Sequence, residues 1–186
     1  ERAFRDGLRE YLRTYTFGNA TWLDLVCILD ARTPEDVSAW SRAWVEERGR
    51  PEFTAALQVE QGRIARLTLT MSDPLRRSLV WPQRLRIGLG YRDGVRSLPV
   101  SVNGRTTRVR DAEGLAAPLF VLPDAGGLGY GLFVLDEASR SYLLANVETV
   151  ADPLARGSAW VTLWENLLEA RITPAALLET IVRALP

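Results

Sequence analysis

The sequence predicts an α+β chain in which helices come first, a small all-β unit follows and helices return at the end. Two periodicities predict this order. Apolar residues recur every three or four positions at both ends of the chain, as in amphipathic helices, and at every second position in the middle, as in strands. The composition, 47% hydrophobic and 25% charged over 186 residues, suits a folded globular chain. We place the boundaries of the three parts at residues 1–50, 51–136 and 137–186.

Two helices are predicted at the start of the chain. Aromatic and leucine residues from Phe4 to Tyr15 form one apolar helical face, and Gly18 supplies a stop signal after it. Thr21 can cap a second, short helix, because a threonine hydroxyl accepts a hydrogen bond from a free amide of the first turn.

A third helix is predicted to begin at Thr33 and to run to about Arg48. Thr33 is a suitable N-cap residue, Pro34 then occupies the first helical position, and acidic residues follow in the first turn. Trp40 and Trp44 lie four residues apart and therefore share a face of this helix. The pair could stack on a sugar or a base, but we favour a place in the core.

About seven short strands are predicted in the middle part. Gln61-Gly62 and Asn103-Gly104 are two-residue hairpin signals, of which the second is the stronger. Short strands with regular turns and no helices between them predict an antiparallel β-sandwich. The predicted strands are 53–59, 64–71, 85–91, 99–102, 105–110, 119–122 and 130–135.

Three more helices are predicted at the end of the chain. The first is short and spans 139–147, Asp152-Pro153 opens a longer one, and Thr173-Pro174 opens the last. The terminal helices of the chain show apolar faces with few partners, so we expect an excised piece of a larger protein. A start without methionine agrees with this expectation. Exposed apolar helix faces and self-association of the piece are expected to follow.

The composition excludes several classes of function. The chain has no histidine, which removes Ser-His-Asp triads and imidazole metal sites. Its 23 basic residues are all arginine and are balanced by 23 acidic residues, so the net charge predicts no nucleic-acid partner and no acidic membrane partner. No apolar run approaches the roughly 20 residues of a membrane span. The compartment stays open.

Cys27 is the only cysteine. A single cysteine excludes an internal disulfide and a multi-cysteine zinc site. It lies in the apolar run 25–29, where we expect a buried and unreactive thiol.

Four further features have a functional and a structural interpretation. Gly127-x-Gly129-x-Gly131 has the spacing of a phosphate loop, but a strand rather than a helix is predicted after it, so we favour a tight turn. Two carboxylates suffice for glycoside hydrolysis, which keeps a carboxylate-only hydrolase open, yet nothing singles out a pair. The acidic candidates, Asp30 and the neighbours Glu46 and Glu47, are expected to be solvated.

Arg156 and Trp81 are the two other candidates. Arg156 could recognise a carboxylate, although an ion pair that holds its helix to the sandwich is favoured. Trp81 could present its ring to a sugar or peptide in a stand-alone binding module, although packing at an edge strand is favoured. Exposure of Trp81 beside a groove would support the binding module, and burial would support a structural role.

Three groups of motifs carry a resemblance to a known family. The first group resembles the end of the thermolysin-like catalytic domain in aminopeptidase N-like zinc metallopeptidases, the gluzincins. The second resembles the stretch that closes their β-sandwich domain, where asparagine is more usual than Asp124. The third is similar to the opening of their α-helical C-terminal domain. The first group is Phe4-x-x-Gly7-Leu8-x-x-Tyr11-Leu12, Tyr15-x-Phe17-Gly18-Asn19-Ala20-Thr21 with Asp24-Leu25, Trp40-x-x-x-Trp44 and Gly49-x-Pro51. The second is Leu122-Pro123-Asp124-x-x-Gly127-x-Gly129-Tyr130-Gly131, and the third is Asp152-Pro153-Leu154-x-Arg156 with Trp160 and Trp164.

The resemblance implies a parent protein that removes N-terminal residues from peptides. Its zinc would be held by a His-Glu-x-x-His helix and a later glutamate, all upstream of the position matched by Glu1. Tyr11 and Tyr15 match the helix after the family's catalytic tyrosine and are not expected to inherit its role. We therefore expect no catalytic, cofactor-binding or metal-binding residue in this chain, with zinc only in the parent.

The resemblance also implies the partners of the chain. They are the missing catalytic and C-terminal domains of the same protein, and a peptide substrate for the parent. The chain itself is expected to act as a spacer and scaffold between those domains.

Overall fold

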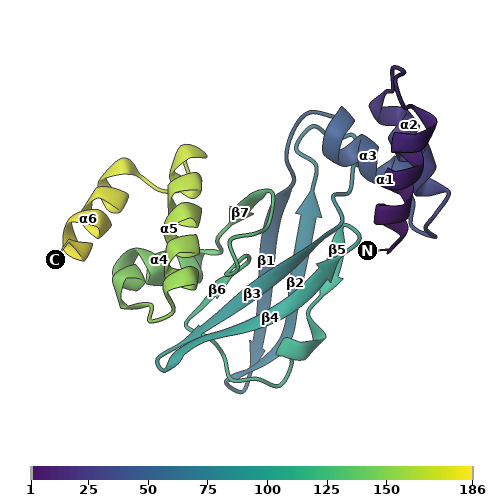
Figure 1. Cartoon of the computed structure of the whole chain (residues 1–186). Helices are drawn as coiled ribbons and strands as arrows, with labels where there is room; N and C mark the ends of the chain where they lie inside the picture. Colours follow the sequence, from purple (N-terminus) through teal and green to yellow (C-terminus); the bar gives the residue numbers. More distant parts are fainter. Residues whose placement is uncertain (1, 186) are drawn as a thin grey trace. The chain divides into compact units, whose positions relative to one another are not determined.

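The computed structural model describes residues 2–185 and groups them into two compact units, with the boundary between Arg48 and Gly49. The first unit is helical and the second combines two sheets with helices, so the predicted α+β class is confirmed (Figure 1). No described helix is long and apolar enough to cross a membrane. The first unit contains α1 (Arg2–Thr14), α2 (Trp22–Asp30), α3 (Val37–Ser41) and a π-helical turn, η1 (Arg42–Glu46).

The first two helices of this unit follow the predicted pattern. Thr21 caps α2 through a capping box, in which its hydroxyl accepts from the Asp24 amide while the Asp24 carboxylate accepts from the Thr21 amide. Helix α1 approaches α2 closely at Gly7, where an added Cβ would lie 2.6 Å from a methyl carbon of Leu29. A side chain at position 7 would therefore require the Leu29 side chain to move.

The third helix differs from its prediction at both ends. Asp36, not Thr33, is its N-cap, because the Asp36 carboxylate accepts a hydrogen bond from the Ala39 amide at 2.7 Å. The Thr33 hydroxyl instead accepts from the Glu35 amide within the preceding turn, at 3.3 Å. The α-helical part ends at Ser41 and the chain continues as η1, so the regular helix is shorter than predicted.

The second unit contains the seven predicted strands in two sheets. The first sheet has the order β5-β2-β1-β7 and the second has the order β4-β3-β6. A left-handed turn at Gln61 and Gly62, with φ of +50° and +73°, joins β1 to β2 in the predicted hairpin. The strands are β1 (Glu52–Glu60), β2 (Arg63–Ser72), β3 (Gln83–Tyr91), β4 (Gly94–Val102), β5 (Thr106–Arg108), β6 (Phe120–Leu122) and β7 (Leu132–Val134).

Two features of the predicted sandwich were wrong. Strand β7 pairs with β1 in parallel, so the first sheet is mixed and not purely antiparallel. Asn103-Gly104 does not close a hairpin, because β4 pairs with β3 in one sheet and β5 pairs with β2 in the other. The segment is a crossover between the sheets. The hairpin turn of the second sheet is Arg92-Asp93, between β3 and β4.

The last three helices are α4 (Glu137–Asn146), α5 (Pro153–Leu168) and α6 (Pro174–Ala184). The predicted caps are present: the Asp152 carboxylate accepts from two amides of the first turn of α5 at 2.9 Å, and the Thr173 hydroxyl accepts from the Ala176 amide at 3.3 Å. Short 3₁₀ turns, η2 (Arg110–Ala112) and η3 (Val147–Thr149), complete the unit.

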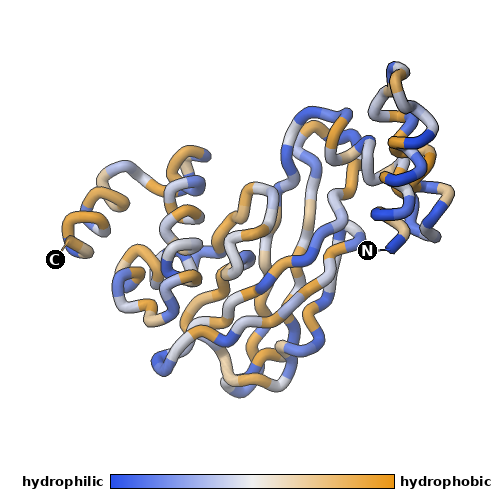
Figure 2. The backbone as a smooth tube through the Cα atoms, viewed as in Figure 1, coloured by the Kyte–Doolittle hydropathy of each residue, from blue (hydrophilic) through white to orange (hydrophobic). Residues whose placement is uncertain are grey.

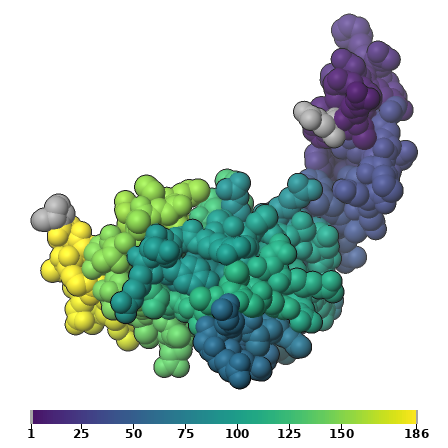
Figure 3. All heavy atoms as spheres, turned by 90° about the horizontal axis from the view of Figure 1, so that it is seen from below, coloured from purple at the N-terminus to yellow at the C-terminus, as the bar shows by residue number. Residues whose placement is uncertain are grey.

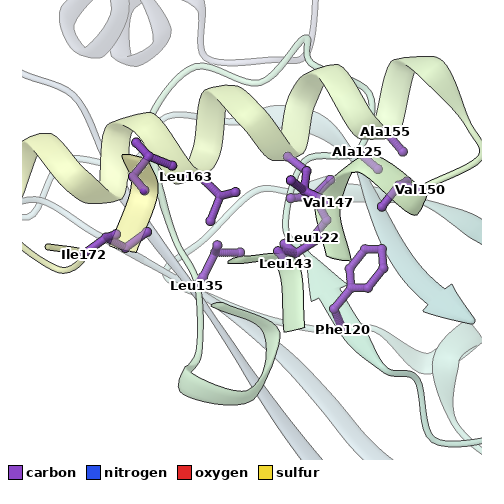
Figure 4. Close-up of a cluster of buried hydrophobic side chains, with 12 residues drawn as sticks. Phe120, Leu122, Ala125, Leu135, Leu143, Val147, Val150, Ala155, Leu163 and Ile172 are labelled. Carbon is purple, nitrogen blue, oxygen red and sulfur yellow. The ribbon is translucent and has the colours of Figure 1, made fainter. Parts of the chain in front are cut away.

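Helices α4 to α6 and the second sheet share one hydrophobic core. Figure 4 shows side chains from strand β6 and the turn after it, among them Phe120 and Leu122, packed against residues of α4 and α5. Leu143 and Leu163 in this cluster are fully buried. In the space-filling view the helices lie directly against the strands of this unit (Figure 3). The helices and sheets of the second unit therefore form one packed body.

Candidate functional site

Trp81, the candidate for a ligand-presenting aromatic, is completely buried. Its relative exposure is 0%, just before β3 begins. A ring without accessible surface cannot stack on a sugar or a peptide. The burial that favours a structural role is therefore observed, and the binding-module alternative loses the residue on which it depended.

Arg156 makes a different contact from the predicted one. Its Nη1 donates to the carbonyl oxygen of Val150 at 2.7 Å, within the helical part of the unit. The expected ion pair between Arg156 and the sandwich is absent from the described residues. Other arginines supply that link: Arg50, just before β1, pairs with Glu165 of α5 at 2.9 Å.

The acidic candidates serve the local structure of the first unit. Asp30, at the end of α2, accepts hydrogen bonds from the Val37 and Ser38 amides at 2.7 and 3.2 Å and so helps to start α3. Glu46 accepts from the Ser41 hydroxyl at 2.6 Å, and Ser41 in turn accepts from the indole of Trp22 at 2.7 Å. Glu46 is exposed, as expected of a solvated carboxylate, whereas Asp30 is half-buried, and both make local hydrogen bonds.

The glycine-rich segment between β6 and β7 forms a tight turn, as predicted. Gly127 and Gly131 have positive φ angles of 63° and 154°, and strand β7 follows directly. The Gly129 amide donates to Asp124 Oδ2 at 2.7 Å, and an added Cβ on Gly129 would lie 2.5 Å from a methyl carbon of Leu85. The glycines here permit close backbone approach, and no helix N-terminus is present to receive a phosphate.

The Trp40–Trp44 pair shares a face, as predicted. The two rings are stacked with centroids 6.4 Å apart and an interplanar angle of 24°. Trp40 is 41% exposed, so the expectation that both rings belong to a core was wrong.

Cys27 also differs from its prediction. It lies on α2 and its side chain is exposed. In that helix Val26 faces inward and is buried, and the thiol one position further along points away. The run of apolar residues concealed this, because 25–29 is apolar on more than one side of the helix.

Tyr15 and Asp24 form the clearest electrostatic pair of the first unit. Desolvation, a hydrogen bond to Asp24 and the carboxylate charge all raise the pKa of Tyr15. Hydrogen bonds from the Thr21 amide and hydroxyl lower the pKa of Asp24. The shift agrees with a Tyr15 hydroxyl that donates a hydrogen bond to the Asp24 carboxylate.

Among residues 2–185, no group of three or more His, Cys, Asp and Glu side chains could hold a metal ion. The expectation that the chain contributes no catalytic, cofactor or metal residue stays a prediction.

The chain can now be placed beside known proteins. No protein-family model matches it. An aminopeptidase N of Streptomyces lividans is 27% identical to it over 189 aligned positions, which cover 92% of the chain. The same alignment covers 22% of the aminopeptidase, so the chain spans about a fifth of that protein's length. The chain is a distant, partial relative of aminopeptidase N.

A network of buried hydrogen bonds lies where α5 of this aminopeptidase N relative meets the sheets. Asn166 on α5 is fully buried, and its Nδ2 donates to the carbonyl oxygens of Phe133 and Thr162, both at 2.8 Å. Its Oδ1 accepts from the Leu135 amide at 3.2 Å. Two of these three hydrogen bonds attach α5 to β7 and to the residue after it, and the third closes on the helix itself.

Ser139 on α4 also forms buried hydrogen bonds that attach its helix to a strand. Its buried hydroxyl accepts from the Val121 amide of β6 at 2.8 Å and donates to the Asp136 carboxylate at 2.6 Å. Sequence reasoning missed both Asn166 and Ser139. The available signal was a small polar residue on the apolar face of a predicted helix, which requires a specific partner once buried.

Large apolar side chains remain exposed on the helices of both units. Leu12 on α1, Trp164 on α5 and Leu178 on α6 are 67%, 53% and 60% exposed. Figure 2 shows hydrophobic positions along much of α6. The predicted exposure of apolar helix faces is therefore observed. The other exposed members on helical segments are Phe4, Trp22, Leu23, Trp40, Val45, Leu154, Val161, Leu168, Ile181 and Val182.

Proposed function

We propose that the chain is a non-catalytic structural segment of a zinc-dependent, aminopeptidase-like protein that removes N-terminal residues from peptides. In this proposal it serves as spacer and scaffold between a catalytic domain and a C-terminal helical domain. The observation that carries the proposal is the relationship to aminopeptidase N, which extends over 92% of the chain but only 22% of the relative.

The assignment of parts belongs to the same proposal. Residues 1–50 would complete the thermolysin-like catalytic domain, residues 51–136 would form the β-sandwich domain, and residues 137–186 would open the C-terminal helical domain. In this assignment a His-Glu-x-x-His zinc helix would lie in another segment, since the sequence contains no histidine.

The packing of the second unit supports a scaffold role. A scaffold must be rigid if it is to hold two domains in fixed positions. Helices α4 to α6 share a continuous apolar core with the second sheet. Ion pairs join the same parts at the surface: Arg50 contacts Glu165 of α5 and Glu169 just after it, and Arg171 contacts Glu52 of β1. Close packing resists deformation, so these helices would move with the sandwich as one piece.

The first test measures zinc and turnover on the chain alone. We expect less than stoichiometric zinc by elemental analysis and no hydrolysis of an aminoacyl reporter above a buffer control. One zinc per chain together with activity that survives repurification would overturn the proposal.

The second test reads the coding sequence upstream of Glu1. A His-Glu-x-x-His motif with a later glutamate is expected there. An upstream sequence without them would remove the zinc aminopeptidase from the proposal even if the isolated chain proved inactive.

A further inference from the structure

A cavity of about 460 Å³ lies where the end of β2 meets the start of β5. Strands β2 and β5 run side by side there, and the Met71 amide donates to the Arg105 carbonyl at 2.7 Å. The loop after β2 folds back over the same point. The cavity is lined by Thr70, Met71, Ser72, Asp73, Arg76, Ser78, Arg105 and Thr106, all from the second unit.

The cavity carries two positive charges that the described residues do not neutralise. Arg76 and Arg105 line it from different segments, and neither makes a side-chain hydrogen bond or ion pair within residues 2–185. The hydroxyls of the four serine and threonine residues in the lining also lack a protein partner in that range. Guanidinium and hydroxyl groups together make a donor-rich lining.

The nearby acidic groups are already satisfied. Asp73 Oδ1 accepts from the Leu75 amide and from Arg77 Nη2, both at 3.0 Å. Its Oδ2 accepts from the amide and Nε of Arg77 at 2.9 and 3.1 Å. Glu52 lies opposite Ser72 across the ladder, but its carboxylate is paired with Arg171 at 3.2 Å. Asp73 is thus paired with Arg77, and Glu52 with Arg171. The positive charges of Arg76 and Arg105 are not neutralised by these two acids.

The loop that carries Arg76 is held in a demanding backbone conformation. Arg76 and Ser78 have φ angles of +58° and +66°, a left-handed region that residues other than glycine seldom occupy. The four hydrogen bonds accepted by Asp73 keep the loop in this conformation. The backbone of the loop that carries Arg76 and Ser78 is thus fixed beside the cavity, while their exposed side chains stay free to meet a ligand.

We propose that this cavity is a binding site for a phosphate-type oxyanion, held by the guanidinium groups of Arg76 and Arg105. A tetrahedral dianion matches two positive charges and several donors from different directions, whereas a planar carboxylate would leave one arginine unpaired. Inorganic phosphate and a phosphate monoester share this chemistry. The site is independent of the aminopeptidase proposal, since it requires no zinc and no peptidase activity.

The test titrates the 186-residue chain with inorganic phosphate at low ionic strength. Calorimetry would give the affinity, and the Nε–H signals of ¹⁵N-labelled arginine would locate it. We expect saturable binding, with two arginine signals shifting together. Arg105→Gln and Arg76→Gln should each weaken binding about tenfold, because a hydrogen bond to a charged group is lost in each. Arg105→Lys should fall between the wild type and Arg105→Gln.

Arg84→Gln is the matched control. Arg84 is an exposed arginine on β3, outside the lining of the cavity, and its substitution removes the same unit of charge. Binding within twofold of the wild type is expected. An equal loss in Arg84→Gln, or no saturation with phosphate, would overturn the proposal.

A second arm compares inorganic phosphate with phosphoserine in a short neutral peptide. Tighter binding of the peptide would identify a monoester as the ligand, and equal or weaker binding would identify free phosphate. Either result supports the oxyanion site only if the Arg105→Gln substitution weakens the binding of that ligand. An unchanged affinity in that variant would count against the site.

Discussion

Gly90 lies on β3 directly opposite Phe120 of β6, and the aromatic ring occupies the space where a side chain would be. Phe120 is only 4% exposed and stacks on Tyr142 with centroids 5.5 Å apart. The ring has no free space into which it could move. At this position glycine is therefore required by packing and not by its φ angle.

Gly90→Ala is predicted to lower the free energy of unfolding by about 2–3 kcal/mol, since the new methyl group overlaps the Phe120 ring. Chemical denaturation would measure the change. Gly104→Ala is the matched control, because nothing lies within 4 Å of its added Cβ and its φ is not positive. A Gly90→Ala variant as stable as the Gly104→Ala variant would show that the Phe120 ring moves aside at little cost.

Asp73 is the residue whose ionisation contributes most clearly to stability. Hydrogen bonds from the Arg77 side chain, and then from the Leu75 and Arg77 amides, lower the pKa of Asp73 to about 2. Its side chain is 3% exposed. Because the folded pKa lies below the unfolded value of about 3.9, the stabilisation is present above roughly pH 4 and is lost as the pH falls towards 2.

Asp73→Asn is predicted to lower the free energy of unfolding at pH 7 by roughly 1–2 kcal/mol. This is less than the pKa shift of Asp73 implies, because its partner Arg77 is 23% exposed and solvent weakens the ion pair. The difference from the wild type should shrink between about pH 4 and pH 2. Asp93→Asn, in the exposed turn between β3 and β4, is the control and should show no such convergence. A constant difference at every pH would mean that the Asp73 charge is unimportant.

Among the elements, α5 is held to the β7 segment by a buried amide in addition to its apolar packing. Asn166 completes three hydrogen bonds at a position with no solvent exposure, and two of them reach the β7 segment. Removing the amide would leave the Phe133 carbonyl and the Leu135 amide buried without partners. An unsatisfied buried group costs more than the net contribution of the bond that was lost.

Asn166→Leu is accordingly predicted to lower the free energy of unfolding by about 2–4 kcal/mol. Denaturation followed by circular dichroism and by tryptophan fluorescence would measure it. Asn103→Ala, an exposed asparagine in the crossover after β4, should change stability by less than about 0.5 kcal/mol. Equal stability of the two variants would show that water replaces the amide.

The crossover at Asn103-Gly104 shows where local signals fail at this scale. An Asn-Gly pair favours a tight turn, and the chain does turn there. A tight turn does not specify which strands pair, and β5 joins β2, which lies far earlier in the sequence. The hairpin between β3 and β4 in the second sheet turns at Arg92-Asp93, just before Gly94. This sequence is a weaker turn signal than Asn-Gly.

At the scale of the whole molecule, the exposed apolar helix faces predict self-association. Phe4 and Leu12 line one apolar groove on α1, and Leu178 and Val182 are 60% exposed on α6. Covering such surfaces with a second copy removes apolar area from water. Sedimentation equilibrium should give an average mass above 20.8 kDa that rises with concentration.

Charged substitutions on these helix faces should reverse the association. Leu12→Glu together with Leu178→Glu is predicted to return the mass towards that of a monomer. Leu128→Glu is the control, since Leu128 is 88% exposed in the turn before β7 and lies on no helix. A wild-type chain that stays monomeric at every concentration would contradict the prediction.

Local sequence signals alone predict the type and order of most helices and strands. Seven strands, the caps at Thr21, Asp152 and Thr173, and the turn at Gln61-Gly62 all follow from neighbouring residues. Periodicity and capping act over a few positions, so the printed sequence contains their causes.

The pairing of the strands and the burial of polar groups depend on the tertiary structure. The pairing of β5 with β2, the parallel pairing of β7 with β1, and the burial of Asn166 against the sheets depend on contacts between residues far apart in the chain. The cavity with Arg76 and Arg105 arose in the same way, because a strand end and a distant loop had to meet before two unremarkable arginines could share a ligand. Long-range packing, which no short window of sequence contains, is the physical reason.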